Sequence, residues 1–410
     1  MKIKRKVLVF FMFFLLIFNN LSFAETPNVD SGAAILVETS TSKILYEKNA
    51  YEKMYPASTT KVLTAILVLE NCQLDEMATV SHNAVYSLPN GYVNASLIEG
   101  EEMSVKDLMY ALMVKSANDA AIVLAEHVGG SVQGFADMMN EKAKELGCKN
   151  THFVNPNGIH DDNHYTTAYD LYLMANYGMK NPIFRKYVST VSYTLPATNK
   201  YSGNDRICLT TNDLLKRNSK YYNENAIGIK TGHTTEAKNC LIAGAEKNDV
   251  ELISVVLHSG TNKEGLSVRY VDTNKLFDYG FNEFKFTDFV ITNDVIQNIE
   301  IENGTKETKN LDLLASDTLN AYINTDTNLE NLEPNVTLNE NIQAPIKQND
   351  ILGTATYTID GIEYTTELIA SHNVDKKIDI EIFILVGAII LLLIGIFILL
   401  KPRKKHKRKK

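Results

Sequence analysis

Apolar residues change their spacing twice along this chain, and this change restricts the fold more than any other feature. Two strand-like runs near the N-terminus, AAILVE (33–38) and ILYEK (44–48), flank the polar turn TSTSK and predict a hairpin. Helical patterns then dominate until AIGIKTG (226–232), after which residues 239–259 predict a second hairpin. Because helices lie between strands at both ends, we predict an α+β domain whose N-terminal hairpin joins a sheet of later strands.

Capping residues mark the starts of the expected helices. Pro56 suits the first turn of a helix that continues through an apolar segment. Ser104 and Thr167 are each followed three residues later by an aspartate, which is typical of a helix N-terminus. Residues 269–281 (RYVDTNKLFDYGF) predict a helix that closes the domain.

Length and composition indicate how many domains to expect. The chain has 410 residues and 45% hydrophobic content, enough for two or three domains. We place the α+β domain at 25–285. Residues 286–376 contain short alternating runs with many Asn and Thr, which predicts a small all-β domain. The formal net charge is −8 although the last ten residues are mostly Lys and Arg, so the body is acidic and no nucleic-acid partner is expected.

Apolar segments at both ends predict export and membrane attachment. Residues 1–24 combine a basic start, an apolar stretch and a small-x-small site, as in a secretory signal peptide; an uncleaved anchor is the alternative. Residues 380–400 are apolar over nearly the ~30 Å of a hydrocarbon core, which predicts a single transmembrane helix. The basic tail, 401–410, then belongs in the cytoplasm and the body outside the cell membrane. Nucleic-acid binding is the alternative for the tail.

Ser58 and Lys61 form a Ser-x-x-Lys pair at the start of the helix near Pro56. Neighbours at i and i+3 share a helix face, and a helix N-terminus favours developing negative charge. Ser58 is therefore a candidate nucleophile with Lys61 as its base. The same spacing at Ser40 and Lys43 falls in the hairpin turn, where it does not bring side chains to one face, so we attribute that match to chance.

An unprotonated lysine at neutral pH needs burial and a neighbouring cation. A free lysine has a pKa of about 10.4, so a base at pH 7 requires a depression of roughly three units, or about 4 to 5 kcal/mol. Lys230, in the single Lys-Thr-Gly triplet, is the candidate cation, and Gly232 would let an extended substrate approach the strand edge. Ser116 and Asn118 lie in a predicted break between helices, where they could meet both lysines across a cleft.

Together these elements resemble the penicillin-recognising serine enzymes, and more particularly the low-molecular-mass penicillin-binding proteins that are D-alanyl-D-alanine carboxypeptidases. The resemblance runs from about Glu25 to the apolar C-terminal segment. The stretch HFVNPNGIHDDNHYTTAYDL is similar to a loop of that family, and KTGHT carries its usual histidine. A spanning segment departs from the amphipathic anchor that the family usually has. The motifs are S-x-x-K at Ser58 to Lys61, S-x-N at Ser116 to Asn118, and K-T-G at Lys230 to Gly232.

The resemblance implies a penicillin-binding, β-lactamase-like DD-peptidase fold and a set of roles. Ser58 would be acylated, and Lys61 would act as its base. Ser116 with Lys230 would relay a proton to the leaving amine.

The resemblance also implies how substrate binds. Asn118 would hold the substrate amide, and backbone N–H groups of Ser58 and His233 would form an oxyanion hole. Arg269 would bind the substrate's terminal carboxylate, to which a fixed guanidinium is well suited. The alternative is that Arg269 is a surface arginine on the closing helix and that a threonine hydroxyl recognises the carboxylate instead. The expected substrate-binding residues are Asn118, Lys230, Thr231, Gly232, His233 and Arg269.

The predicted function is a serine-type D-Ala-D-Ala carboxypeptidase that removes the terminal D-alanine from peptidoglycan stem peptides through an acyl-enzyme. Penicillins and other β-lactams would bind it covalently. Two alternatives remain at this point: a β-lactamase of the same superfamily, which would need an efficient deacylating base, and a non-catalytic penicillin-sensing or wall-binding protein.

No metal or organic cofactor is expected. The four cysteines show no Cys-x-x-Cys spacing and have no histidine cluster nearby in the sequence, which argues against a zinc site and favours unpaired thiols. His160 and His164 flank two aspartates that could bind a cation, but we expect them to order a loop. The cysteines are Cys72, Cys148, Cys208 and Cys240.

Overall fold

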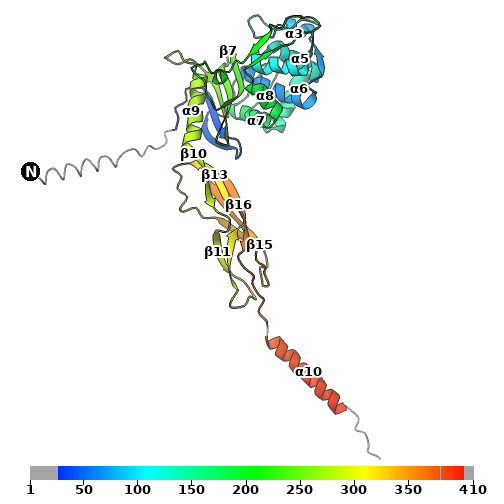
Figure 1. Cartoon of the computed structure of the whole chain (residues 1–410), viewed down its shortest axis with the longest axis vertical. Helices are drawn as coiled ribbons and strands as arrows, with labels where there is room; N and C mark the ends of the chain where they lie inside the picture. Colours follow the sequence, from blue (N-terminus) through cyan, green and yellow to red (C-terminus); the bar gives the residue numbers. More distant parts are fainter. Residues whose placement is uncertain (1–25, 379, 401–410) are drawn as a thin grey trace, which may run out of the picture. The chain divides into compact units, whose positions relative to one another are not determined.

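The computed structural model describes residues 26–378 and 380–400 (Figure 1), so the predicted signal peptide and basic tail lie outside the described residues. The chain forms two compact units. The first contains the described residues up to Lys285 together with Tyr322–Thr327, and the second contains Phe286–Ala321 and the residues from Asn328 onward. Strands β10 (Phe284–Val290) and β13 (Leu319–Asn324) cross from one unit to the other.

A five-stranded antiparallel sheet forms the centre of the first unit, in the order β2-β1-β9-β8-β7. The N-terminal strand β1 lies between its hairpin partner β2 and the late strand β9, with Ile35 opposite Val255. This confirms the predicted α+β arrangement, in which the first hairpin joins the later strands. The strands are β1 (Ala33–Glu38), β2 (Lys43–Lys48), β7 (Ala226–Thr234), β8 (Lys238–Lys247) and β9 (Val250–Ser259).

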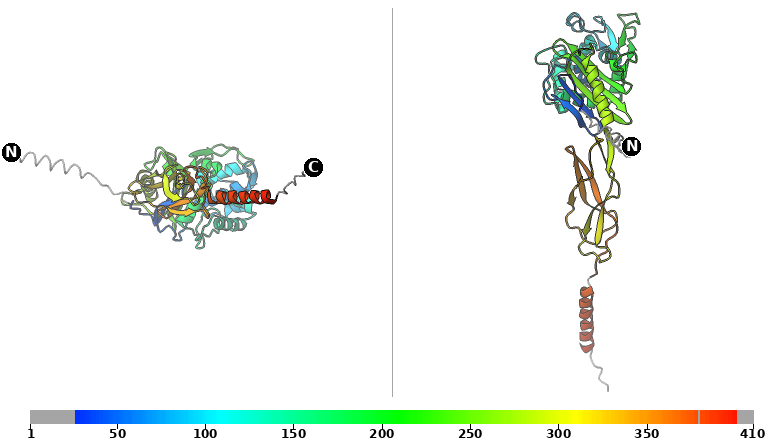
Figure 2. Two further views of the ribbon diagram at one scale, coloured as in Figure 1. Left: turned by 90° about the horizontal axis from the view of Figure 1, so that it is seen from below. Right: turned by 90° about the vertical axis from the view of Figure 1, so that its left-hand side faces the viewer.

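Helices cover both faces of this sheet (Figures 1 and 2). Side chains alternate across a strand, and β1 is buried throughout. Ile35 and Val37 pack into a core with the helices of the larger layer, whereas Leu36 packs on the opposite face with Phe277 of α9 (Val268–Glu283). The predicted closing helix is therefore α9.

The predicted caps are present. Ser104 Oγ accepts from the backbone N–H of Asp107 at 3.1 Å, and Thr167 Oγ1 accepts from that of Asp170 at 2.9 Å. The helix expected at Pro56 begins instead as a 3-10 turn, η1 (Ala57–Thr60), and becomes α-helical at Lys61. The helices of this layer are α2 (Lys61–Asn71), α3 (His82–Tyr86), α4 (Val105–Tyr110), α5 (Asn118–Gly129), α6 (Val132–Glu145), α7 (Ala168–Met179) and α8 (Pro182–Ser189), with the π-turn η2 (Ala111–Lys115) and the 3-10 turn η3 (Asp213–Leu215).

Short strand pairs complete the first unit. They are β3 (Met77–Thr79) with β4 (Glu102–Ser104), and β5 (Ser192–Thr194) with β6 (Ile207–Leu209).

The second unit is built on an antiparallel sheet in the order β11-β12-β16-β15-β14. Leu311, Leu313 and Leu368 are fully buried in its core. The predicted small all-β domain is therefore present. Its strands are β11 (Val295–Glu300), β12 (Asn310–Ala315), β14 (Asn335–Leu338), β15 (Ile351–Ile359) and β16 (Ile362–Ala370).

The apolar C-terminal segment forms helix α10 (Ile380–Leu400). The prediction that it crosses a membrane is not confirmed, because no helix within the described residues is long and apolar enough for a span.

Candidate active site

Ser58 and Lys61 lie together where η1 passes into α2. Lys61 Nζ is 2.9 Å from Ser58 Oγ, so the predicted i, i+3 pair is in contact. The serine and lysine of the other Ser-x-x-Lys match do not form such a pair, as expected. Ser40 lies in the hairpin turn, and Lys43 Nζ is buried and donates to the carbonyl oxygen of Tyr322 at 2.8 Å.

Two further oxygens surround the Lys61 amine. Its Nζ is 2.8 Å from Asn118 Oδ1 and 2.6 Å from the carbonyl oxygen of Asn157. Lys61 is 0% exposed, and burial first and then the charge of Lys230 hold its pKa well below the ordinary value of 10.5, while Asp119 acts in the opposite direction. The physical cause that we predicted, burial plus a second lysine, is therefore present.

A neutral amine has two N–H groups and one lone pair. The Asn118 and Asn157 oxygens can accept both N–H groups of Lys61, which leaves the lone pair for the Ser58 hydroxyl. The site can thus hold Lys61 in the form that accepts a proton from Ser58.

Ser116 and Lys230 form a second hydroxyl–amine pair, with Oγ and Nζ 2.8 Å apart. Ser116 follows the π-turn η2 and has the left-handed φ of 65°, which turns the chain between η2 and α5. Burial first and then the charge of Arg269 lower the pKa of Lys230 from 10.5 to about 7. The helix break therefore meets both lysines, Asn118 contacting Lys61 and Ser116 contacting Lys230.

Strand β7 carries the K-T-G triplet along the same cleft. A Cβ on Gly232 would lie 2.9 Å from the Pro56 carbonyl oxygen and 3.1 Å from Ser58 N. Glycine at position 232 therefore lets β7 approach the segment that carries Ser58. This is a second role beside the predicted one, in which Gly232 lets substrate approach the strand edge. Thr231 Oγ1 is 2.5 Å from Thr211 Oγ1, and His233 is exposed.

Arg269 reaches the cleft from α9. Its Nη1 donates to the Gly232 carbonyl oxygen at 3.1 Å, and its guanidinium lies 4.7 Å from the centre of the Tyr270 ring. These contacts fix the guanidinium beside the K-T-G strand.

One cleft of about 460 Å³ unites these groups. Every predicted site residue lines it except the two lysines, which are buried behind their serine partners. The lining residues are Ser58, Asn90, Gly91, Tyr92, Val93, Ser116, Asn118, Gly158, Ile159, Thr211, Thr231, Gly232, His233, Thr234, Thr235 and Arg269.

Two loops at the cleft make contacts that the sequence did not predict, although the second lies in the stretch that resembles a loop of the family. The 90–93 loop is held by Asn118, whose Nδ2 donates to the Val93 carbonyl oxygen at 2.8 Å, and by Asp119, whose carboxylate accepts from Ala95 N at 2.9 Å. The other loop supplies the Asn157 carbonyl. A backbone oxygen has no residue-type signal, although the Pro-Asn-Gly turn could have indicated the loop.

The expected loop-ordering role suits His164. Its Nε2 lies 2.8 Å from Thr60 Oγ1 and its Nδ1 accepts from Val154 N at 3.1 Å, so both ring nitrogens are engaged. Burial lowers the His164 pKa from 6.5 to about 3 and keeps the ring neutral. All four cysteines are free thiols.

Comparisons with known proteins agree with this geometry. Residues 20–261 match the family described as D-alanyl-D-alanine carboxypeptidase, which is more than half of the chain. The chain belongs to this family. Within this D-alanyl-D-alanine carboxypeptidase family member, residues 284–376 match the C-terminal domain of penicillin-binding protein 5.

Relatives of this family extend over most of the chain. D-alanyl-D-alanine carboxypeptidase DacF of Bacillus subtilis (strain 168) is 31% identical over 355 residues, which cover 86% of each protein. DacC of Escherichia coli (strain K12) is 30% identical over 381 residues, which cover 88% of this chain and 90% of that protein. The crystal structure of the D-alanyl-D-alanine carboxypeptidase DacD from Francisella tularensis has a TM-score of 0.65 and 26% identity, covering 88% of this chain and 97% of that one. The Streptomyces K15 DD-transpeptidase has a TM-score of 0.57 and 34% identity, covering 63% and 99%.

Proposed function

We propose that this chain is a serine-type D-Ala-D-Ala carboxypeptidase that removes the terminal D-alanine from peptidoglycan pentapeptide stems and is acylated by penicillins at the same serine. One observation carries the proposal: the buried Lys61 amine lies 2.9 Å from Ser58 Oγ, with two carbonyl oxygens placed to take up its N–H groups. The activity named for the relatives of this chain agrees with it.

Acylation begins with proton transfer from Ser58 to Lys61. The Ser58 oxygen then attacks the carbonyl carbon of the penultimate D-alanine. Backbone N–H groups of Ser58 and His233 stabilise the oxyanion, which the close packing of Gly232 against the serine segment supports.

Ser116 and Lys230 act on the leaving group. The hydroxyl of Ser116, 2.8 Å from Lys230 Nζ, passes a proton to the departing D-alanine amine and takes up in its place the proton that Lys61 removed from Ser58, which leaves Lys61 neutral again. Water then hydrolyses the acyl-enzyme, with Lys61 as the base for the water, and releases the shortened peptide and free Ser58.

The remaining cleft residues position the substrate. Asn118 holds the substrate amide and Thr231 the strand-like substrate backbone beside β7. Arg269 binds the terminal carboxylate, because its guanidinium is already fixed at Gly232 and lines the cleft.

We also propose a location and a division of the chain. Residues 1–24 direct export and are removed, 25–285 form the peptidase domain, 286–376 the β domain, and 401–410 a basic tail. The peptidase domain acts outside the cell membrane, to which the 380–400 segment attaches it. In support, Phe383, Leu391 and Phe397 on α10 are 69%, 71% and 72% exposed, so this helix presents apolar surface that a bilayer would cover.

Covalent labelling and turnover test the proposal together. Wild type incubated with penicillin should gain one acyl group by mass spectrometry, and a peptide ending in D-Ala-D-Ala should lose one D-alanine. Ser58→Ala should abolish both, whereas Ser40→Ala should retain both. Labelling that persists in Ser58→Ala would exclude this serine as the nucleophile. Labelling without peptide turnover would favour the sensor, and rapid release of hydrolysed penicillin without peptide turnover would favour the β-lactamase.

A further inference from the structure

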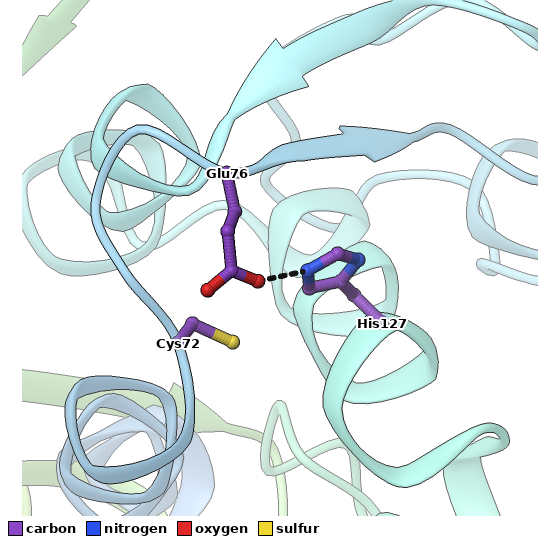
Figure 3. Close-up of side chains that lie close together, drawn as sticks. All are labelled: Cys72, Glu76 and His127. Carbon is purple, nitrogen blue, oxygen red and sulfur yellow. Dashed lines mark hydrogen bonds and ion pairs between the residues drawn. The ribbon is translucent and has the colours of Figure 1, made fainter.

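Cys72, Glu76 and His127, none of which lines the cleft, point toward one another (Figure 3). One ligand atom from each residue lies within 4.8 Å of the other two. His127 Nε2 is 3.2 Å from Glu76 Oε2. Cys72 is half-buried while the other two are exposed, so an ion from solvent can reach the group.

The backbone around Cys72 and Glu76 is fixed. Cys72 N donates to the Val68 carbonyl at 3.0 Å and caps α2. Gln73 and Glu76 close a turn in which Glu76 N donates to the Gln73 carbonyl at 3.3 Å and Glu76 Oε1 accepts from Gln73 N at 2.5 Å. Val105 N donates to the Glu76 carbonyl at 2.8 Å. Two of the three side chains are thus presented by a turn that is already ordered.

We propose that Cys72, Glu76 and His127 bind a zinc-type divalent transition-metal ion. Thiolate, imidazole and carboxylate are the ligands that zinc takes in proteins. Bonds of about 2.0 to 2.3 Å at tetrahedral angles place neighbouring ligand atoms about 3.3 to 3.5 Å apart. The His127–Glu76 distance of 3.2 Å is already close to this value, and the sulfur, within 4.8 Å of both atoms, needs to move by about 1.5 Å or less. Binding displaces the thiol proton of Cys72 to solvent, and water completes the fourth position.

This inference departs from the sequence prediction of no metal. That prediction relied on ligand spacing along the chain, but His127 comes from α5, 51 residues after Glu76. A simple ion pair between His127 and Glu76 is the competing interpretation. The chain contains a natural comparison for it: His82 Nδ1 lies 3.1 Å from Glu99 Oε2 in an exposed pair that is not among the metal-ligand groups of the described residues.

The position of the site in the fold indicates what it would do. Helices α2 and α5 are packed together, and their N-terminal ends meet where Lys61 Nζ contacts Asn118 Oδ1 at 2.8 Å. Cys72 follows the last residue of α2, and His127 lies in the last turn of α5. The ion would therefore join the two helices at their far ends, about 16 Å from the cleft along α2. Its expected effect is to stabilise the helix pair that carries Lys61 and Asn118, with no chemistry on substrate.

Zinc binding to the full-length protein tests the site. The reduced, detergent-solubilised chain is titrated with zinc chloride against a chromogenic zinc chelator, with wild type and the variants Cys72→Ser and His127→Gln. We expect one ion per chain, bound at least tenfold more weakly by either variant. The matched controls are His82→Gln, which removes the histidine of the other His–Glu pair, and Cys148→Ser, which removes the other half-buried thiol. Both should bind as wild type does.

Cobalt gives a readout that an ion pair would not produce. Wild type loaded with Co²⁺ should show a near-ultraviolet thiolate-to-cobalt charge-transfer band, which Cys72→Ser should lack and Cys148→Ser should retain. Zinc should also raise the melting temperature of wild type but not of Cys72→Ser, with far-ultraviolet circular dichroism verifying that the variants fold. If wild type lacks the band, or if Cys72→Ser binds zinc as tightly as wild type, the proposal is wrong. Penicillin labelling does not enter either outcome, so the metal site and the proposed enzyme can fail independently.

Discussion

At the residue scale, burial lowers the pKa of Lys61 and Lys230, because the charged form of an amine is unfavourable away from water. The accompanying loss of folding stability provides an unprotonated amine beside a serine. Lys230 is 1% exposed, and burial together with Arg269 lowers its pKa to about 7. In the unfolded chain the same group titrates at about 10.4. Between these two pKa values the unfolded state binds the additional proton, so Lys230 makes the folded state gain stability as the pH rises.

This sign gives a prediction for Lys230→Met. The free energy of unfolding of wild type, minus that of the variant, should increase from pH 7 to pH 10, the interval in which Lys230 is protonated in the unfolded chain and has lost its proton in the folded one. Lys230 also lowers the pKa of Lys61, so the substitution should raise the pKa of Lys61. This second effect changes the difference in free energy of unfolding in the same direction with pH. Urea unfolding at several pH values measures the difference, with Lys180→Met at an exposed position as the control. Parallel curves for wild type and Lys230→Met would contradict the prediction.

At the element scale, the loop that carries the Asn157 carbonyl must lie directly against η1. Gly158 has a φ of +82°, and a Cβ there would be 1.8 Å from the Ala57 carbonyl oxygen. Gly158→Ala should therefore separate the loop from η1 and remove the Asn157 oxygen from Lys61, which it contacts at 2.6 Å. We expect the rate of acylation by penicillin to fall by about tenfold or more, because small displacements of positioned groups have large kinetic effects.

Gly147→Ala is the matched control for this change. Gly147 has a φ of +85° but nothing within 4 Å of an added Cβ, so the substitution introduces the same backbone strain, about 1 to 2 kcal/mol, without the contact. It should lower stability and leave acylation unchanged. Equal acylation rates for the two variants would mean that the loop does not position the base.

The secondary-structure elements differ in how well the sequence predicts them. Local signals sufficed for the β1–β2 hairpin and for the caps at Ser104 and Thr167, because each depends on residues a few positions apart. Helix α6 was not predicted, although Ser131 caps it at Gly134 N and its buried Phe135, Met139 and Ala143 recur every four residues, so a local signal was present.

The site divides in the same way between local and long-range information. The sequence motifs located the hydroxyls of Ser58 and Ser116 and the amines of Lys61 and Lys230, because each motif is defined by residue types at a fixed spacing. The Asn157 carbonyl and the approach of His127 to Cys72 depend on the tertiary fold, which places separate segments together without any signal in their spacing.

At the scale of the whole molecule, the question is what holds the peptidase near its substrate. The proposal assigns this to α10, whose described side chains between Phe383 and Leu400 are largely exposed and apolar. Burial of such a surface gains about 25 cal/mol per Å², so a helix of this length should bind a membrane firmly whether it crosses the bilayer or lies within one leaflet. The basic residues that follow would add attraction to an anionic surface.

Two truncations separate these contributions. A chain that ends at Lys377 lacks α10, whereas a chain that ends at Leu400 retains α10 and lacks only the basic tail. After cell fractionation, full-length protein and the Leu400 chain should remain in the membrane pellet through an alkaline wash, and the Lys377 chain should be released with its penicillin-labelling activity intact. Protease added outside intact protoplasts should digest the peptidase domain of the full-length protein. A Lys377 chain that stays in the pellet, or a peptidase domain protected from outside protease, would overturn attachment through α10 or the proposed orientation, respectively.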